Sequence, residues 1–328
     1  MRAYKKWLGA ILLLFALAFQ TGCGQLEIED RAFPLALTIT PAGQNGLYQF
    51  LFYFEETDAE DSGLYHKEDT CVTAAGYPQA FAMLGRRQSG GLDDTHMQVI
   101  LLSENLLDDE PFLESFYQYF MKEHHFSWNT MVYLLDEHSA APDSLKKGTD
   151  GRTGTYLRNM AQSDEQEKTA GVPTLGDLYM EWNNHEQILL LPVLSDDEQP
   201  AVDHYRLLVQ GACGETLTVD DARLLQFLRG DLKKMQLELA DQTIVSLQNI
   251  RTWRTYVPAH GVWQVTVSME CGAENRLQQS ALEQERMLRE SERILRGQIG
   301  QSGKWALIKD ADGRLVLPEY QIKMFLAE

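Results

Sequence analysis

The cysteine at position 23 stands where covalent lipid chemistry would take place. It follows a basic start and an uncharged apolar run, Leu8 to Phe19, and it ends the tripeptide Thr21-Gly22-Cys23. A basic segment, an apolar segment of about a dozen residues and small residues before a cut site indicate a secretory signal. The run is shorter than the roughly 20 residues of a spanning helix. Because the site resembles a bacterial lipobox, we expect removal of residues 1–22 and a diacylglycerol on Cys23. An uncleaved anchor and a plain secretory signal with an incidental cysteine are the alternatives.

The other three cysteines are Cys71, Cys213 and Cys271, and they are scattered singly. Outside the cytoplasm an odd number allows at most one disulfide and one free thiol. None forms a Cys-x-x-Cys motif or has a histidine nearby at ligand spacing. We therefore expect small buried side chains, and the spacing leaves open whether any two of them pair.

The histidines and carboxylates do not form a catalytic or metal-binding pattern. No histidine has another histidine or a cysteine three or four residues away, and on a helix adjacent histidines such as His124-His125 point about 100° apart. No Gly-x-Ser-x-Gly, Walker or dinucleotide motif is present. With 48 acids, close carboxylate pairs are inevitable, so we expect the three acidic clusters to be solvated loops. Asp310 to Gly313 lacks the closing glutamate of a calcium loop and predicts a turn. The eight histidines are His66, His96, His124, His125, His138, His185, His204 and His260, and the acidic clusters are Asp93-Asp94, Asp108-Asp109-Glu110 and Asp196-Asp197-Glu198. The sequence thus predicts no catalytic residue, no metal and no cofactor.

The chain is strongly acidic. Its 328 residues carry a formal net charge of −19, and removal of residues 1–22, which hold three basic residues and no acids, would bring it nearer −22. Such a surface repels phosphate backbones, so we expect no nucleic-acid partner. It would also be held off an anionic bilayer, and membrane attachment must then come from lipid or partner proteins. Two acyl chains on Cys23 would suffice.

The first half alternates strands and helices. Strands at 35–39 and 47–54, joined by a turn at 41–46, predict a β-hairpin. Later the chain predicts a strand, a helix with one wide apolar face and a second strand, which together form a right-handed βαβ unit with parallel strands. The polar, glycine-bearing stretch 148–171 predicts a flexible loop. A strand at 188–194 should lie at a sheet edge or end at Pro192. The remaining elements expected here are a short helix at 79–86, the βαβ unit at 97–102, 111–120 and 130–135, a helix at 174–182 and an acidic break at 195–200.

The second half predicts mostly strands and a long helix. We expect a helix capped by Asp220 or Asp221 and ended by Gly230. The helix predicted at 274–298 is the longest, and we expect it to pack across a sheet, with a coiled-coil partner as the alternative. The other predicted elements are a strand at 205–209, a turn at 211–214, strands at 234–239, 243–254 and 262–269, and a last strand between 314 and 326.

These elements predict a mixed α/β (α+β) fold. We expect two to three domains, each a mixed sheet with packed helices, and a long C-terminal helix. Residues 1–22 form the signal peptide, 23–195 an N-terminal α/β domain that contains the 148–171 loop, and 196–328 a C-terminal α/β region of one or two small subdomains.

Several segments together resemble one family. They are Cys23 followed by Glu27-Ile28-Glu29-Asp30 and the aliphatic strand Ala32 to Ile39, then His96 to Leu106, Pro173-Thr174-Leu175-Gly176 and Leu191-Pro192-Val193-Leu194. They are similar to the Ger(x)C lipoproteins, which are the C subunits of spore germinant receptors in endospore-forming Firmicutes. The likeness also includes the long charged helix near the end, and it covers most of the chain.

The resemblance implies a function. It implies a multi-domain α/β protein on the outer face of the spore inner membrane, anchored by lipid on Cys23, beside the polytopic A and B subunits. It assigns no catalytic residue or cofactor, so a non-enzymatic role in receptor assembly or signalling is expected. The alternative is a solute-binding lipoprotein of a transporter, which requires two similar α/β lobes with repeated βαβ units. A surface hydrolase is a third reading, and no motif supports it.

Overall fold

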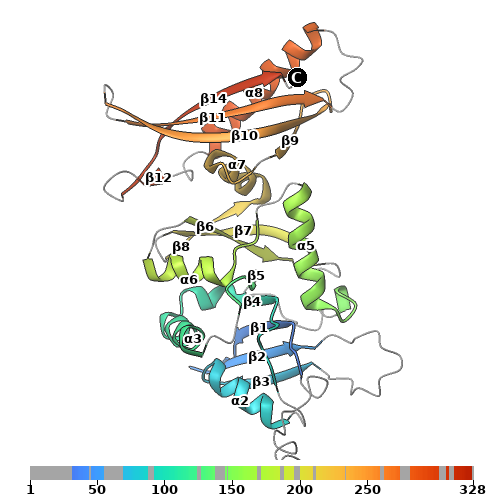
Figure 1. Ribbon diagram of the computed structural model, residues 1–328, viewed down its shortest axis with the longest axis vertical. Coiled ribbons are helices and arrows are strands. Elements are labelled where there is room, and N and C mark those ends of the chain that lie inside the picture. The colour runs from blue at the N-terminus through green and yellow to red at the C-terminus, as the bar shows by residue number, and fades with distance from the viewer. Residues whose placement is uncertain are drawn as a thin grey trace, which may run out of the picture.

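The structure is a computed structural model whose two larger sheets lie one above the other along the long axis of the molecule (Figure 1). It describes residues 32–43, 46–54, 69–87, 92–123, 127–136, 145, 147–167, 171–184, 188–195, 200–209, 212–232, 234–258, 262–273, 281–302, 308–309 and 314–326. The mixed α/β fold class is confirmed, and the sheets below mix parallel and antiparallel strands.

The first sheet has eight strands in the order β3-β2-β1-β4-β5-β6-β7-β8. Its centre, from β1 to β6, is parallel, and antiparallel strands flank it on both sides. The predicted hairpin and the predicted parallel βαβ unit are both confirmed. The strands are β1 Ala36–Pro41, β2 Tyr48–Tyr53, β3 Thr70–Ala74, β4 Val99–Ser103, β5 Met131–Leu135, β6 Ile188–Leu194, β7 Val202–Val209 and β8 Ala212–Thr218.

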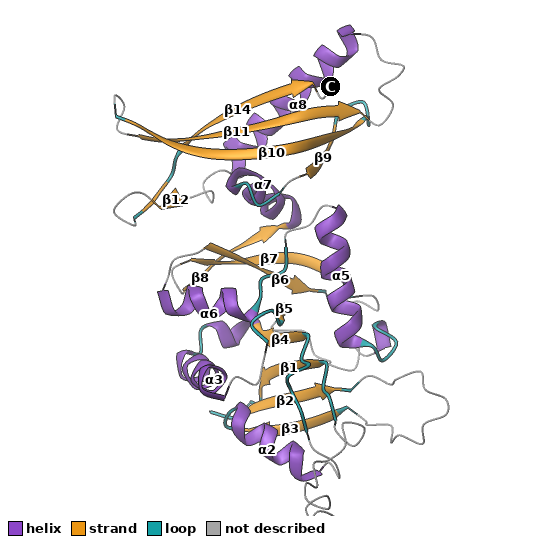
Figure 2. Ribbon diagram, viewed as in Figure 1, coloured by secondary structure: helices purple, strands orange, loops and turns teal. Residues whose placement is uncertain are grey.

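Helices cover both faces of the first sheet (Figure 2). Helices α2, α3 and α6 contribute to one core with Leu37, Ile39 and Phe50, whereas α5 packs on the opposite face against Val99 and Leu101. Because both faces of the sheet are covered, all five residues of β4 and all seven residues of β6 are buried. The helices are α2 Tyr77–Arg87, the 3₁₀ turn η2 Glu104–Leu107, α3 Glu110–Glu123, α5 Thr153–Glu167 and α6 Leu175–Asn184.

The flexible loop predicted at 148–171 is wrong, because most of it is helix α5. Leu157 and Ala161 of this helix are buried against the sheet. A Cβ atom on Gly154 would lie 2.8 Å from the Leu35 Cβ and 2.9 Å from the Leu35 carbonyl carbon. Gly154 therefore permits a close contact between helix and sheet, and it does not mark a linker.

The edge position predicted for the strand with Pro192 is also wrong. β6 lies between β5 and β7 and continues past the proline to Leu194. The ladder with β5 pairs only Leu134 with Val193 and Leu135 with Leu194. Pro192 thus precedes that ladder, and its missing N–H removes no hydrogen bond from it.

A strand replaces most of the turn predicted at 211–214. β8 begins at Ala212 and pairs with β7, with a register shift between Arg206 and Leu208. A Cβ atom on Gly214 would lie 3.0 Å from the Leu207 carbonyl oxygen. The glycine therefore permits a close strand approach at an irregular point of the ladder, where we had expected chain reversal.

The second sheet has four strands in the order β14-β11-β10-β9. β10 is antiparallel to β9 and β11, and β14 runs parallel to β11. Helices α7 and α8 pack with one face of this sheet, and α8 lies behind the strands in Figure 1. The bounds are β9 Lys234–Glu238, β10 Ile244–Val257, β11 Val262–Ala273, β14 Glu319–Leu326, α7 Val219–Arg229 and α8 Ala281–Ser302, with a small pair β12 Ile308–Lys309 and β13 Leu315–Val316.

The long C-terminal helix is confirmed and packs on this sheet. Met287 and Leu295 of α8 belong to the core that contains Val265 and Ile322. The described helix begins at Ala281, and residues 274–280 of the prediction lie outside the described part of the chain. The packing agrees with the expected helix-on-sheet arrangement.

The cap of α7 was predicted two or three residues too late. Thr218 is the N-cap, and its hydroxyl oxygen accepts from the Asp221 amide at 3.2 Å and donates to the Asp221 carboxylate at 2.8 Å. Asp221 is thus the third residue of the helix and completes a reciprocal cap. The end at Gly230 is confirmed, with a left-handed φ of 83°.

The predicted division at residues 195 and 196 falls between two neighbouring strands. β6 ends at Leu194, β7 begins at Val202, and the two pair along their length in the first sheet. Two strands that were assigned to the C-terminal region, β7 and β8, therefore complete the first sheet. The division into 23–195 and 196–328 remains a prediction.

Candidate interaction surfaces

The predicted lipidation residue Cys23 lies outside the described residues, but the chain that follows it enters the fold at a defined edge. Ala32 is buried and forms a parallel bridge with Leu92. It precedes β1, so it lies at the edge where the amino ends of the parallel strands β1, β4 and β5 meet. Residues 24–31 can span at most about 30 Å, at roughly 3.5 Å per residue.

The remaining cysteines show no disulfide in the part of the chain that is described. Cys71 is exposed on β3 and Cys213 is half-buried on β8, and both are free thiols. Burial raises the pKa of each thiol. Cys271 lies on β11, and the structure describes only its backbone. The expectation of buried side chains is therefore wrong for Cys71.

Two histidines are described, and they have structural partners. His96 makes an edge-to-face contact with Phe33, with ring centroids 4.9 Å apart. His204 is discussed below. Among the described residues no group of three or more histidines, cysteines or carboxylates could hold a metal ion. The other six histidines, His66, His124, His125, His138, His185 and His260, lie outside the described ranges.

Two carboxylates that we expected in solvated loops are structural. Asp94 is fully buried and accepts from the Tyr77 hydroxyl at 2.7 Å. Asp109 accepts from the Tyr48 hydroxyl at 2.7 Å and from the Phe112 amide at 3.1 Å, which caps α3. Burial and then the hydrogen bond to Asp109 raise the pKa of Tyr48 to about 12. The cluster at residues 196–198 lies outside the described part.

A polar cluster joins the turn after β4 to β7. Glu104, which follows β4, lies 3.4 Å from the His204 Nε2 and 3.7 Å from the Arg206 Nε. Arg206 also donates to the Thr216 hydroxyl at 2.9 Å, and His204 Nδ1 lies 2.9 Å from the Asp203 carboxylate. Glu104 and His204 are 100 positions apart in the sequence, so no local sequence signal predicts the cluster. It links the central parallel strands with the antiparallel end of the sheet.

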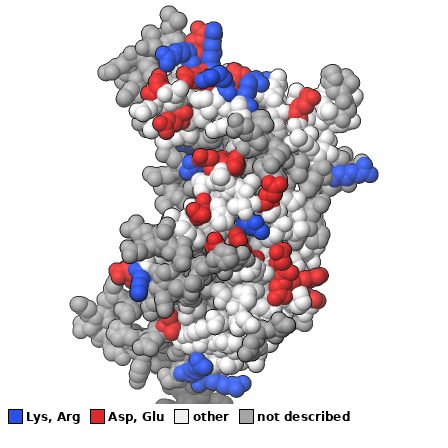
Figure 3. Space-filling model, turned by 180° about the vertical axis from the view of Figure 1, so that it is seen from behind, with Lys and Arg blue, Asp and Glu red and all other residues white. Residues whose placement is uncertain are grey.

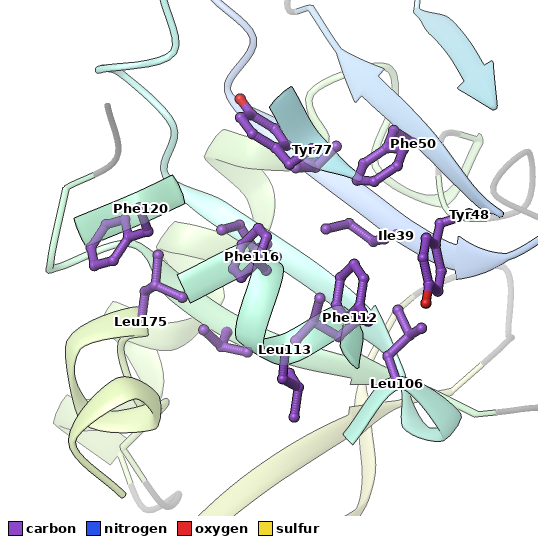
Figure 4. Close-up of a cluster of buried hydrophobic side chains, with 14 of the residues drawn as sticks. Ile39, Tyr48, Phe50, Tyr77, Leu106, Phe112, Leu113, Phe116, Phe120 and Leu175 are labelled. Atoms are coloured by element: carbon purple, nitrogen blue, oxygen red, sulfur yellow. The ribbon is translucent and has the colours of Figure 1, made fainter. Parts of the chain in front are cut away.

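Aromatic side chains fill the core under α2 and α3 (Figure 4). Phe112 and Phe116 of α3 stack with centroids 5.7 Å apart and lie near Ile39 of β1. The Tyr117 ring lies 4.8 Å from Trp182 of α6, and its hydroxyl is buried without a hydrogen-bond partner in the described structure. Burial therefore raises the pKa of Tyr117.

The Pro-Thr-Leu-Gly motif at residues 173–176 fixes α6 to the sheet. Leu175 donates its amide hydrogen to the Thr130 carbonyl at 2.7 Å, and Gly176 donates to the Trp128 carbonyl at 3.0 Å. A Cβ atom on Gly176 would lie 3.0 Å from the Trp128 ring. Trp128 remains 42% exposed beside the motif. The motif is therefore explained by the close packing of the start of α6 against the segment that precedes β5.

One face of the second sheet has no described helix or strand over it, and it is turned toward the viewer in Figure 1. We call it the outer face. Val245 of β10, Val265 of β11 and Ile322 of β14 point into the core with α7 and α8, and alternate residues point outward. In β10 the register shifts between Gln248 and Arg251, so that Ile250 points into the core and Trp253 points outward. Three of these outward residues are large and exposed: Ile244 at 46%, Trp253 at 43% and Phe325 at 55%.

On the side of the second sheet opposite the outer face, the exposed surface of α8 is charged. Arg289 pairs with Glu285 and Arg296 with Glu292, each four residues apart. In Figure 3, which shows the molecule from behind, basic and acidic side chains alternate at the upper end where α8 lies. Such pairing is typical of a solvated helix face. The two sides of the second sheet therefore differ in character.

Comparison with known proteins supports one family. Residues 24–196 match the family described as spore germination protein N-terminal domain. The crystal structure of the GerBC protein is similar over 81% of this chain and 80% of that chain, with 12% identity and a TM-score of 0.47. No curated protein matches the chain. The family match spans more than half of the 328 residues, and the chain therefore belongs to the spore germination proteins that carry this N-terminal domain.

Proposed function

We propose that this protein is the lipid-anchored C subunit of a spore nutrient germinant receptor. It would act without catalysis, in receptor assembly or signalling, beside two integral membrane subunits. The observation that carries the proposal is membership of the spore germination family, whose match begins at residue 24. The Thr21-Gly22-Cys23 site directly precedes that residue.

The anchor would be the diacylglycerol on Cys23. None of the described helices is both long and apolar enough to cross a membrane. The eight residues 24–31 would then place the amino edge of the first sheet within about 30 Å of the spore inner membrane, on its outer face. Two acyl chains suffice for stable attachment.

The anchor is tested by metabolic labelling with a fatty-acid analogue. The native chain should incorporate the label, and the Cys23→Ala chain should not. The Cys71→Ala chain is the matched control, because Cys71 is an exposed thiol on β3 and should not affect labelling. Equal labelling of the native and Cys23→Ala chains would overturn the anchor.

The receptor assignment is tested by purification from spore membranes through a C-terminal tag, followed by mass spectrometry. Co-purification of two polytopic receptor subunits is the expected result. A permease with an ATPase would favour the alternative, a solute-binding lipoprotein. That alternative needs two similar lobes, but the first sheet has a parallel centre with helices on both faces, whereas the second is largely antiparallel.

A further inference from the structure

The outer face of the second sheet is electrically neutral in a chain of net charge −19. Strand pairing places three basic residues on it, Lys234, Arg251 and Lys323, and three acidic ones, Glu238, Glu270 and Glu319. The other outward positions are mostly Ser, Thr and Gln. A neutral face lets another acidic protein approach without the repulsion that the rest of the surface would exert.

Its dimensions approach those of a protein interface. β10 has 14 residues and β11 has 12. At about 3.4 Å per residue and about 4.8 Å between strands, the four-stranded face measures roughly 40 Å by 15 Å. The resulting area of roughly 600 Å² is somewhat below the roughly 800 Å² that each partner buries in a standard complex. A weak association is therefore expected.

The arrangement of side chains on the face is self-complementary. Arg251 and Trp253 both point outward from β10 and lie two residues apart, about 7 Å. A two-fold axis that passes between them, in the plane of the face and perpendicular to the strands, places Arg251 of one copy over Trp253 of the other. The reverse contact follows by symmetry. An arginine over an indole ring is a favourable cation–π pair.

The same axis relates the neighbouring strands in a compatible way. Thr266 and Ser268 of β11 pair with Trp253 and Arg251 of β10, so the axis sets two short side chains opposite each other. The Thr266 hydroxyl is buried and donates to Gln321 of its own chain at 3.5 Å, so this row brings no charge into the contact. On β14 the axis places Lys323 of one copy opposite Gln321 of the other, so residues of like charge do not face each other at these positions.

We propose that two copies of this chain associate face to face through the outer face.

Membrane attachment would strengthen this weak contact. Two copies held on one membrane surface meet at a far higher local concentration than two copies in solution. This step depends on the proposed lipid anchor, whereas the interface itself does not. Failure of the anchor can therefore be distinguished from failure of the interface by sedimentation equilibrium of the purified full chain at high concentration.

Photo-crosslinking in native membranes tests the proposal. Two full-length copies with different C-terminal tags are expressed together, each with Lys323→p-benzoylphenylalanine on the exposed outer face. We expect a crosslinked product of twice the chain mass that carries both tags. The matched control is Arg293→p-benzoylphenylalanine, an exposed position on α8 at the opposite side, which should give no such product.

Two tryptophan variants complete the test. Trp253→Glu should reduce the two-tag product at least tenfold, because it removes the ring from both reciprocal contacts. Trp128→Glu, with the same change at an equally exposed tryptophan outside the second sheet, should leave the yield unchanged. Circular dichroism checks that both variants fold. An equal yield from Trp253→Glu, a product with a different protein, or no product in membranes and no dimer in sedimentation would each overturn the proposal.

Discussion

The two sheets of this protein differ in how they are covered, and the difference explains their sequences. Helices cover both faces of the first sheet, so its central strands are continuous apolar runs such as Val99 to Leu102. Helices cover one face of the second sheet, so β10 alternates, with Val245 and Leu247 buried and Ile244 exposed. Parallel strands in α/β folds are buried on both sides, and antiparallel strands often have one solvated face. The comparison indicates that the first sheet is buried on both faces, whereas the second sheet leaves one face available for contact with another molecule.

The largest expected effect distinguishes the covered sheet from the uncovered face. Leu101→Ala removes a fully buried side chain from the central strand β4 and should lower the free energy of unfolding by about 2–5 kcal/mol. Trp253→Ala, on the outer face, should lower it by less than about 1 kcal/mol. Urea denaturation followed by circular dichroism measures both. Similar losses would mean that the outer face is covered in solution.

The second prediction compares two helical glycines. Gly154→Ala in α5 should destabilise the protein by about 1–3 kcal/mol, because the new Cβ would overlap the Leu35 backbone. Gly297→Ala in α8, where a Cβ would meet nothing within 4 Å, should stabilise it by about 0.5–1 kcal/mol. We expect Gly154→Ala to lower the melting temperature and Gly297→Ala to raise it. A gain in stability from Gly154→Ala would refute the close helix–sheet contact.

The third prediction concerns the cap of α7, which lies between the two sheets in the chain. Thr218→Ala should cost about 1 kcal/mol, because the Asp221 amide loses its acceptor. Asp220→Ala, at a residue that the sequence had suggested as the cap, should cost less than half as much, since Asp220 makes only an exposed pair with Arg223 at 3.7 Å. Thermal unfolding measures the loss of stability in each variant. A larger loss from Asp220→Ala than from Thr218→Ala would support the cap that the sequence predicted.

The smallest effect is the part of the pH dependence that Tyr48 of the first sheet contributes. The pKa of Tyr48 is raised to about 12 in the folded state, above its ordinary value of 10.0. Its contribution to stability is therefore complete below pH 10 and is lost as the pH rises toward 12. Tyr48→Phe should flatten the stability profile in that window, as measured by urea denaturation at pH 9 to 12. An unchanged slope would show that the pKa of Tyr48 is not raised in the folded state.

Local patterns in the sequence predicted the elements whose signals are themselves local. The β1–β2 hairpin followed from alternation and a turn, the βαβ unit from one wide apolar helix face between two apolar runs, and the end of α7 from Gly230. The family also followed from short motifs, and its match confirms it. Each of these signals depends on residues that lie close together in the sequence.

Tertiary contacts decided the elements that the sequence misled us about. Gly154 and Gly214 suggested a loop and a turn, but each permits a close approach of backbone segments that only the packed fold brings together. Pro192 is tolerated inside the sheet because the ladder with β5 starts one residue later. Asp94 lies in the interior, where the hydrogen bond from Tyr77 helps to offset the cost of burying its carboxylate.

The sequence by itself determined the acidic charge, the expected lipid site at Cys23, the mixed α/β class and the family. Only the tertiary structure decided which residues meet across long separations, such as Glu104 with Arg206, and which sheet face remains uncovered. The physical reason is that hydrophobic periodicity encodes which side of an element is buried but not what buries it. The free face of the second sheet is therefore a property of the fold.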